Sequence, residues 1–140
     1  MVCALQDYPS LVEWGCYGTD LPNVPNVPYN ASNLTGVGAE IGDGIYNTNG
    51  ILNDCPSAPA ALAAHSLGPE WFLPSAKELK QMYINRTTLE AAPGFSTFGD
   101  LYWSSTEFES SFAYFFGFND GYADYYFKDY TLNVRGVRAF

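Results

Sequence analysis

Few residues in this chain could carry out catalysis, and they lie far apart in the sequence. His65 is the only histidine, and no nucleophile or acid stands beside it to complete a general acid–base pair. Ser104 and Ser105 are the other candidates, yet they lack the surrounding Gly-x-Ser-x-Gly turn that exposes a hydrolase serine. We interpret these serines as groups that hydrogen-bond the backbone where a strand becomes a loop. We therefore expect no enzyme activity.

Carboxylates in the first half of the chain offer one cation site to consider. Glu40, Asp43 and Asp54 accompany a glycine-rich stretch, and carboxylate and carbonyl oxygens are the ligands that Ca²⁺ takes in proteins. A zinc site is not expected, because no Cys-x-x-Cys motif accompanies the single histidine. We expect no cofactor, with calcium as the alternative.

Three cysteines, Cys3, Cys16 and Cys55, leave an odd one in any pairing. In one interpretation all three are buried as small hydrophobic side chains. In the other, Cys16 and Cys55 form a disulfide, which would stabilise the fold by about 3 to 4 kcal/mol through the loop that it closes. The residues leave both interpretations open.

The most unusual feature of the sequence is an aromatic segment near its end, residues 108–133. Eleven of its 26 residues are Phe or Tyr, most others are small or acidic, and Leu132 is its only Val, Ile or Leu. Buried strands use such aliphatic residues far more often. Tyr combined with Asp, Ser and Asn is typical of binding surfaces, because Tyr supplies a large, stiff, amphipathic contact at low entropic cost.

The genetic code adds an independent observation on the aromatic segment. Asparagine codons altered at their two adenines encode Asn, Tyr, Asp, Ser, Phe and other residues, but never Trp, Met, Gln, Glu or Lys. Only Glu109 and Lys128 in the segment lie outside the encoded set. The composition therefore fits codons that have been diversified at adenine.

Strand alternation separates core from surface within the aromatic segment. Tyr114, Phe116 and Phe118 alternate, so in a strand they would share one face, which we expect to be buried. We also assign Ala113, Gly121 and Lys128 to the framework.

The remaining aromatic residues of the segment are expected at the surface, because burying all of them would need more core than a small domain offers. An exposed aromatic patch of that extent marks a binding site. The predicted ligand-binding residues are Phe108, Ser110, Ser111, Phe112, Phe115, Asn119, Asp120, Tyr122, Asp124, Tyr125, Tyr126, Asp129, Tyr130 and Leu132. Their aspartates favour a cationic or hydrogen-bonding partner.

Strands are expected to frame this surface, over residues 102–106 and 134–140. A hairpin is expected to turn near Asn119-Asp120-Gly121, because Asp-Gly supplies the positive φ of tight turns. At the start of the chain, residues 1–19 predict a first strand and a short helix near 10–14. Residues 20–50 predict a long irregular segment.

Two helices are expected between these parts. The first covers residues 57–67, with Ser57 as a cap and Pro59 in the first turn. The second begins with a capping box of Ser75 and Glu78. Its buried stripe is expected to be Leu79, Met82 and Tyr83, and residues 87–92 are expected to add one turn. Helices followed by an antiparallel sheet predict an α+β fold.

The overall composition is that of a folded globular domain. The 140 residues are 47% hydrophobic and 15% charged, which suits one domain with its own core. The net charge is −9 and the six basic residues form no cluster, so nucleic-acid binding is not expected. No run of about eighteen apolar residues occurs, so direct membrane insertion is not expected either. The first residues do not form a signal peptide, and we expect an export signal outside this chain.

Three motifs carry a resemblance to a known family. They are Trp71-Phe72-Leu73-Pro74-Ser75-Ala76-Lys77-Glu78-Leu79, Tyr102-Trp103-Ser104-Ser105-Thr106-Glu107 and Val134-Arg135-Gly136-Val137-Arg138-Ala139-Phe140. Together they resemble bacterial C-type lectin-like domains, named for the C-terminal part of a collagen-like surface adhesin. Within that family the chain is most similar to variable proteins of diversity-generating retroelements. In these, a reverse-transcribed template corrupted at adenines rewrites the C-terminal part of a lectin-like fold.

The resemblance implies a C-type lectin-like fold, with two main helices packed on a twisted antiparallel sheet and long ordered loops. It implies one domain over residues 1–140, with a scaffold over 1–100 and a variable ligand-binding region at about 108–133 between the scaffold strands of 101–140. It also implies a non-catalytic receptor or adhesion function on a bacterial surface, such as a pilus, or on a phage particle. The favoured partner is then a protein on a host or neighbouring cell, with a glycan as the alternative.

A fixed adhesin domain of the same fold, binding glycans or matrix polymers without diversification, is the alternative function. C-type lectins often bind sugars through calcium, but the Glu-Pro-Asn and Trp-Asn-Asp ligand pairs do not occur here. Calcium-dependent sugar binding is therefore not expected.

Overall fold

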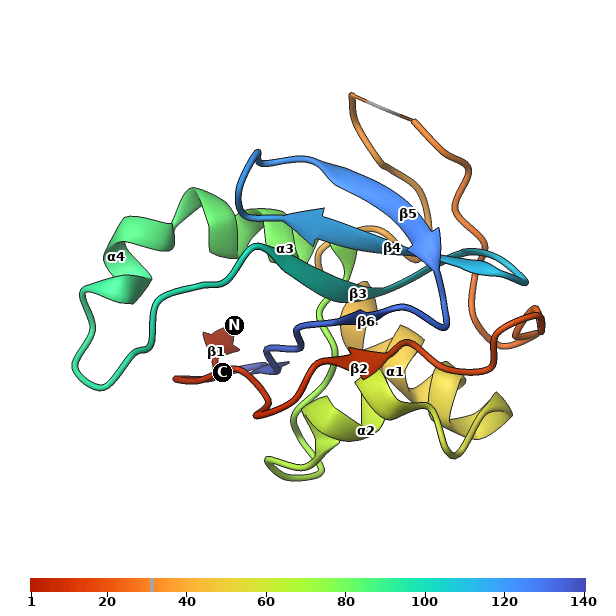
Figure 1. The fold of residues 1–140 in the computed structure, drawn as a ribbon, viewed down its shortest axis with the longest axis horizontal. Helices are drawn as coiled ribbons and strands as arrows, with labels where there is room; N and C mark the ends of the chain where they lie inside the picture. Colours follow the sequence, from red (N-terminus) through yellow and green to blue (C-terminus); the bar gives the residue numbers. More distant parts are fainter. Residues whose placement is uncertain (31) are drawn as a thin grey trace.

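The computed structural model describes residues 1–30 and 32–140, which form an α+β fold with short helices, small antiparallel sheets and one disulfide (Figure 1). The helices are α1 (Asp43–Asp54), α2 (Pro59–His65), α3 (Ala76–Ile84) and α4 (Arg86–Glu90). The strands are β1 (Val2–Cys3), β2 (Val12–Glu13), β3 (Leu101–Glu109), β4 (Phe112–Gly117), β5 (Ala123–Phe127), β6 (Thr131–Leu132) and β7 (Val137–Arg138). The α+β class predicted from the sequence is confirmed.

Strands β3, β4 and β5 form an antiparallel sheet with β4 in the middle. Tyr102 of β3 lies opposite Phe116 of β4, so the strand predicted over residues 102–106 is confirmed. The turn between β4 and β5 contains Gly121 at φ 80°. This is the positive value that favours glycine, and it confirms the predicted hairpin.

Two short strand pairs bring the start of the chain to its end. Val2 of β1 lies opposite Arg138 of β7, and Val12 of β2 lies opposite Leu132 of β6. The strand predicted over residues 134–140 is shorter than expected, since β7 covers only Val137–Arg138. The two termini lie close together beside β1 (Figure 1).

The helices cover the sheet from its sides. Both α1 and α3 pack against β3, while α2 packs against α1 and β2. Helix α3 begins with the predicted capping box: the Glu78 N–H donates to Ser75 Oγ (3.3 Å) and the Ser75 N–H donates to Glu78 Oε2 (2.8 Å). Leu79 and Met82 are buried and Tyr83 packs beside them, which confirms the predicted stripe.

The short helix predicted near residues 10–14 is wrong, because Val12–Glu13 forms strand β2. The neighbouring Trp14 is 1% exposed and its Nε1–H donates to the Ser104 carbonyl (2.8 Å). The helix was predicted from Ser10 as a possible N-cap with Glu13 three residues later. Strand pairing and burial of the Trp14 ring outweigh this capping signal, which is worth about 1 kcal/mol.

The irregular segment predicted for residues 20–50 includes residue 31, which lies outside the described residues, and it ends earlier than expected, because α1 begins at Asp43. Gly44 and Gly50 resemble turn residues in the sequence but lie inside this helix. A Cβ on Gly50 would collide with the carbonyl oxygen of Asn23, and one on Gly44 would collide with the Glu78 carboxylate. These glycines are there for close packing rather than for a turn.

The other two helices match their predicted positions but not their ends. Helix α2 spans Pro59–His65 instead of 57–67, and its N-cap is Ala58 rather than Ser57, with no side-chain cap hydrogen bond. Helix α4 spans Arg86–Glu90 where a turn over 87–92 was predicted. None of the helices in the described residues is long and apolar enough to cross a membrane.

Cys16 and Cys55 form a disulfide that joins the loop after β2 to the end of α1, with their Cα atoms 6.3 Å apart. Of the two interpretations of the cysteines, the pairing is therefore correct. Cys3 is free and half-buried, and burial raises the pKa of its thiol to about 11. Because disulfides persist in oxidising compartments, the bond is consistent with an extracytoplasmic location.

Candidate ligand-binding surface

The sheet sorts the aromatic segment into buried and exposed side chains. Five residues assigned to the framework or core are buried: Ala113, Tyr114, Phe116, Phe118 and Lys128. Gly121, also assigned to the framework, is a half-exposed turn residue. Strand β5 lies at the edge of the sheet, and its side chains from 124 to 127 are exposed. The exposed part of the segment is thus the edge strand and the turns beside it.

One face of the sheet carries a group of rings that we call the first aromatic cluster. Its members are Tyr17, Tyr29, Phe108, Phe112, Tyr125 and Phe127. The Phe112 ring centre lies 4.6 Å from that of Phe127, its cross-strand partner, and 5.2 Å from that of Tyr125. Aromatic pairs at such distances contribute about 0.5–1.5 kcal/mol beyond the area they bury. The rings therefore hold one another in place. Tyr125 and Phe127 are exposed, whereas Phe108 and Phe112, like Phe115 on the other face, are only half-exposed although they were predicted at the surface.

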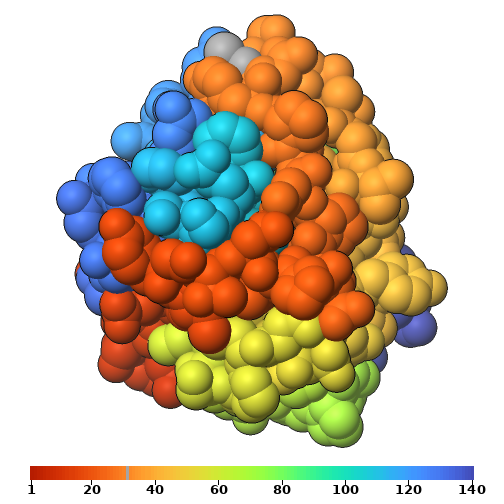
Figure 2. Space-filling model, turned by 90° about the vertical axis from the view of Figure 1, so that its right-hand side faces the viewer, coloured from red at the N-terminus to blue at the C-terminus, as the bar shows by residue number. Residues whose placement is uncertain are grey.

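Three members of the first aromatic cluster were not in the predicted site. Phe127 belongs to the aromatic segment, but Tyr17 and Tyr29 come from the N-terminal loops, where isolated tyrosines give no pattern to follow. The Tyr29 ring packs edge-on against Tyr125 at 5.2 Å, and the Tyr17 ring lies 6.4 Å from Phe127. Both are well exposed, Tyr17 at 51% and Tyr29 at 45%. Figure 2 shows the β3–β4 turn (cyan) lying between β5 (blue) and these loops (red and orange).

The opposite face of β5 carries the second aromatic cluster, Phe115, Tyr126 and Tyr130. The Tyr126 ring centre lies 4.4 Å from that of Tyr130 and 5.8 Å from that of Phe115. Asp124, the cross-strand partner of Phe115, shares this face. Tyr130 also lies 5.5 Å from Phe127, so the two clusters meet at the end of the edge strand.

The residues of the β3–β4 turn are partly exposed, and their backbone also binds neighbouring segments. Ser110 and Ser111 are half-exposed, and their carbonyls accept the N–H groups of Gly18 (3.1 Å) and Lys128 (2.9 Å). Asp129 is exposed in the turn that follows β5. The β3–β4 turn is therefore tied both to the N-terminal loop and to the strand beside it.

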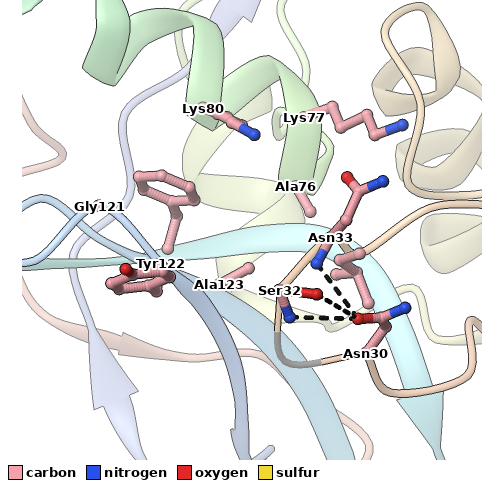
Figure 3. Close-up of a pocket in the computed structure, with 11 residues that line it drawn as sticks. Asn30, Ser32, Asn33, Ala76, Lys77, Lys80, Gly121, Tyr122 and Ala123 are labelled. Atoms are coloured by element: carbon pink, nitrogen blue, oxygen red, sulfur yellow. Dashed lines mark hydrogen bonds between the residues drawn. The ribbon is translucent and has the colours of Figure 1, made fainter.

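Three predicted site residues lie at the far end of the β4–β5 hairpin. Asn119, Asp120 and Tyr122 are exposed in its turn, and Asp120 Oδ1 accepts the N–H of Tyr122 (3.1 Å). Strand β4 places this turn about 20 Å from the β3–β4 turn, at about 3.3 Å per residue. Figure 3 shows Tyr122 instead across from Asn30, with α3 on a third side. The predicted site is thus divided between two ends of one hairpin.

The prediction for Leu132 is wrong. Its side chain is 7% exposed and belongs to the same core cluster as Trp14 and Trp103. The pairing of β6 with β2 turns Leu132 inward, and because side chains alternate along a strand, its neighbour Thr131 faces solvent instead.

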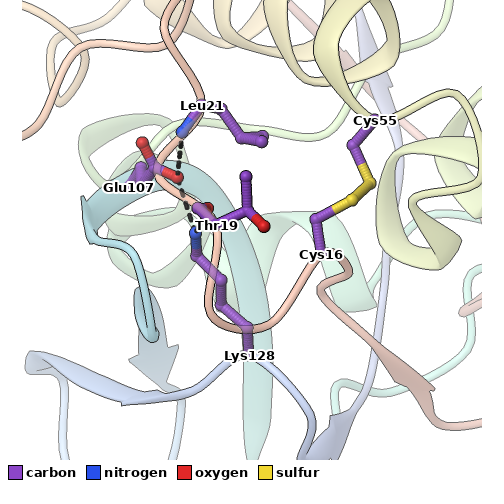
Figure 4. Close-up of a disulfide and its surroundings, with 6 residues drawn as sticks. All are labelled: Cys16, Thr19, Leu21, Cys55, Glu107 and Lys128. Atoms are coloured by element: carbon purple, nitrogen blue, oxygen red, sulfur yellow. Dashed lines mark hydrogen bonds and ion pairs between the residues drawn. A yellow bond between two sulfur atoms is a disulfide. The ribbon is translucent and has the colours of Figure 1, made fainter.

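A buried ion pair connects Glu107 of β3 with Lys128, the residue that follows β5 (Figure 4). The Lys128 ammonium donates to Glu107 Oε2 (2.6 Å) and to the Thr19 carbonyl (2.9 Å), and neither charged side chain is exposed. The same Glu107 oxygen accepts the N–H of Leu21 (3.3 Å). The ammonium also lies 4.8 Å from the centre of the Trp14 ring. One pair of charges thus joins β3, the end of β5 and the N-terminal loop.

The protonation of this pair is set mainly by burial. Loss of water raises the pKa of Glu107 to about 7, although the Lys128 ammonium acts in the opposite direction. Burial likewise lowers the pKa of Lys128. Among the described residues, Glu107 Oε1 has no hydrogen-bond partner, which adds to the cost of a buried carboxylate. Lys128 was predicted to belong to the framework, but its pairing with Glu107 was not predicted.

The carboxylates considered as calcium ligands each accept hydrogen bonds that stabilise a loop. Glu40 bonds the Lys77 ammonium (2.7 Å), and this bond is the main reason that its pKa falls to about 2. Asp43 Oδ2 accepts the N–H of Gly38 (2.7 Å), and Asp54 Oδ2 accepts the N–H of Asn23 (2.7 Å). In residues 1–30 and 32–140, no group of three or more His, Cys, Asp or Glu side chains is placed to hold a metal ion.

The residues considered for catalysis make structural hydrogen bonds. His65 Nδ1 lies 2.6 Å from the Trp71 carbonyl oxygen. The Ser104 hydroxyl donates to the Tyr114 carbonyl (2.6 Å), as the backbone-bonding interpretation predicted. Ser105 Oγ accepts a hydrogen bond from Asn47 Nδ2 (3.1 Å). The exposed tyrosines of the two aromatic clusters offer apolar contact through their rings and hydrogen bonds through their hydroxyls.

Comparison with known proteins does not assign this surface. No protein-family model matches the chain, and no curated protein is significantly similar to it. Its function is therefore inferred from the geometry of the two clusters and their support.

Proposed function

We propose that this chain is a non-catalytic ligand-binding domain of C-type lectin-like fold, whose exposed aromatic clusters are a surface diversified by a retroelement. The observation that carries the proposal is the division of the aromatic segment. Side chains typical of a paratope, Tyr125, Tyr126 and Tyr130, are exposed at one edge, while Tyr114 and Lys128 of the same segment are completely buried. Such a division lets surface residues vary without loss of the core.

The scaffold beneath the surface supports this proposal. The Glu107–Lys128 pair, the disulfide at Cys16 and the β3–β4 turn hold the ends of the clusters from behind. A surface already ordered before binding loses less conformational entropy when a ligand arrives. The α+β arrangement, the pairing of both chain ends and the long loops are compatible with the lectin-like fold that we propose.

We propose a protein as the ligand, displayed on a host or neighbouring cell. The two clusters lie on an edge strand and the turns beside it rather than around a deep cavity, which suits an extended protein contact. Tyrosines in the centre of such contacts often supply much of the binding energy. The carboxylates of Asp124, Asp129 and Glu109 lie beside the rings in the exposed strands and turns, and they would favour basic groups on the partner. The setting would be a bacterial surface structure or a phage particle.

The DNA around the encoding gene tests this proposal. We expect a second copy of the segment that encodes residues 103–140, next to a reverse transcriptase gene. It should differ almost only at adenines, in codons for exposed residues such as Tyr125, Tyr126 and Tyr130 and not in those for Tyr114 or Lys128. A complete locus without such a repeat would contradict diversification.

One observation favours a fixed adhesin as the second candidate. Tyr17 and Tyr29 contribute rings to the first aromatic cluster from loops outside the aromatic segment, so part of the surface would stay constant in any diversified relative. A glycan or matrix polymer bound with similar affinity by homologues that differ at Tyr125 and Tyr126 would support this candidate over the first.

A further inference from the structure

A small cavity lies at the Tyr122 end of the hairpin, away from the aromatic clusters (Figure 3). It has a volume of about 40 Å³ and is lined by residues of α3, by Asn30, Ser32, Asn33 and Leu34, and by the β4–β5 turn. Water needs roughly 10–15 Å³ of such space, so the cavity has room for one small polar group and not for a whole sugar or peptide. Figure 3 shows the Asn30 and Asn33 side of the cavity facing Tyr122 and Ala123, with α3 along the third side.

The cavity gathers much of the exposed positive charge of a strongly acidic chain. Lys77 and Lys80 both line it, and the third lysine, Lys128, is buried in the ion pair described above. Lys77 is already bonded to Glu40 (2.7 Å). Lys80 is exposed and forms no ion pair or hydrogen bond with any residue that the structure describes. Its ammonium is therefore available to a ligand.

The loop that contains Asn30 and Asn33 forms a second, polar wall of the cavity. Asn30 Oδ1 accepts from the N–H groups of Ser32 (3.1 Å) and Asn33 (3.2 Å), which fixes this wall of the cavity. The Asn33 side chain makes no hydrogen bond within the described residues, so its amide is free to donate. Asp120, the nearest acid in the turn, is engaged with the N–H of Tyr122 (3.1 Å).

The opposite wall is held rigidly by the β4–β5 turn. Gly121 has a φ of 80°, and a Cβ there would lie 2.8 Å from the Tyr83 ring. At Gly121 the turn therefore packs directly against Tyr83 of α3. A cavity whose walls are set before binding can orient a small group at low entropic cost.

We infer that this cavity is a carboxylate subsite, in which Lys80 and Asn33 bind one acidic group of the protein ligand while the aromatic clusters make the main contact. The inference rests on the proposed ligand-binding function. The net charge of −9 repels free anions, so the subsite acts on a carboxylate brought in by a larger partner and sets its orientation. That carboxylate can come from an acidic side chain or from a chain terminus, and both share this chemistry.

Three small probes test the subsite in NMR titrations that follow the backbone amides of Asn33, Lys80 and Gly121. N-acetylaspartate α-amide carries a side-chain carboxylate, N-acetylalanine carries a terminal one, and N-acetylasparagine α-amide is neutral. We expect at least one acidic probe to shift these signals with a Kd on the order of millimolar, as for a single weak contact. The neutral probe should leave them unchanged. The stronger of the two acidic probes identifies the source of the carboxylate.

Variants make the test specific. Lys80→Gln should weaken binding of the acidic probe about fivefold, the effect of one exposed ion pair, with the thermal midpoint unchanged. Arg138→Gln, a half-exposed base on the far strand β7, is the matched control and should bind as the original chain does. Equal shifts with the neutral probe, no shifts with either acid, or unaltered binding by Lys80→Gln would each overturn the subsite.

Different results would refute the subsite and the proposed function. A Tyr125→Ser/Tyr126→Ser variant removes rings from both aromatic clusters but should bind the acidic probe normally, because neither ring lines the cavity. Loss of probe binding in this variant would contradict a separate subsite. A failed subsite, conversely, leaves the aromatic clusters and the test of the surrounding DNA unaffected.

Discussion

The Lys128 ammonium and the Glu107 carboxylate form an ion pair 2.6 Å long in which neither side chain is exposed to solvent. Removing one partner from such a pair leaves a buried charge without compensation, whereas removing both often costs little. Their positions at the ends of β5 and β3 make this pair one link between the scaffold and the candidate surface.

The ion pair gives a prediction for a double-mutant cycle. At pH 8, above the pKa of Glu107 of about 7, Lys128→Met alone should lower the free energy of unfolding by about 3–5 kcal/mol, because it leaves the ionised Glu107 side chain without its partner. Glu107→Gln/Lys128→Met should be more stable than this single variant by about 2 kcal/mol or more. Urea unfolding measures all of these values. If the double variant were no more stable than Lys128→Met, the two side chains would not be coupled as described.

The raised pKa of Glu107, about 7, gives a prediction for the pH dependence of stability. In the folded chain Glu107 holds its proton up to that pH, whereas in the unfolded chain it releases it near its ordinary value of 4.5. This group therefore contributes stability that is fully present below pH 4.5 and is lost as the pH rises through 7. When Glu107 is protonated, the Lys128 ammonium still donates to the Thr19 carbonyl and lies beside the Trp14 ring. The negative charge of nearby Asp20 also raises the pKa of Glu107.

Urea unfolding between pH 5 and pH 8 checks this dependence. Compared with Glu107→Gln/Lys128→Met, the original chain should lose stability as the pH rises over this range. The double variant serves as the reference because it keeps Glu78, whose pKa is also raised by burial. Parallel pH profiles for the two proteins would show that Glu107 does not titrate in this window. At the acid end, Glu40, with its pKa of about 2, acts in the opposite sense and loses its contribution only as the pH falls below 4.5.

Matched substitutions at two tyrosines separate surface from core. Tyr114 is completely buried and its hydroxyl donates to the Val27 carbonyl (2.7 Å), so Tyr114→Ser should cost about 3–5 kcal/mol of stability. Tyr126 is 38% exposed, so Tyr126→Ser should cost about 1 kcal/mol or less. Chemical unfolding compares the two. Similar losses for both would mean that the second aromatic cluster is part of the core and not a binding surface.

The disulfide gives a prediction about redox conditions. Cys16→Ser/Cys55→Ser should lower the free energy of unfolding by about 3 to 4 kcal/mol, because the bond closes a loop with a sequence separation of 39. Cys3→Ser, at the free cysteine, is the control and should change stability by about 1 kcal/mol or less. Dithiothreitol should destabilise the original chain and leave the double variant unchanged. A response of the double variant to the reductant would point to a different pairing.

Part of this structure could be predicted from interactions between residues close together in the sequence. The capping box of Ser75 and Glu78, the Asp-Gly turn at Gly121 and the alternation of Tyr114, Phe116 and Phe118 depend on residues within a few positions of one another. Propensity, capping and pleat act over that range. The same signals identified most of the exposed part of the aromatic segment, because its composition differs from that of a core.

Contacts between distant segments account for what the residues could not indicate. Strand pairing turned Leu132 inward and replaced a local helix signal at Ser10 with strand β2. Tyr29 is part of the surface only because its loop packs beside Tyr125. Glu107 pairs with Lys128 although two other strand segments separate them in the sequence. These pairings depend on strand register and on the burial of whole elements, and their free energy is the sum of many weak contacts throughout the core. A short stretch of sequence does not determine that sum. Only the tertiary structure therefore decides which residues form the surface and which support it from the interior.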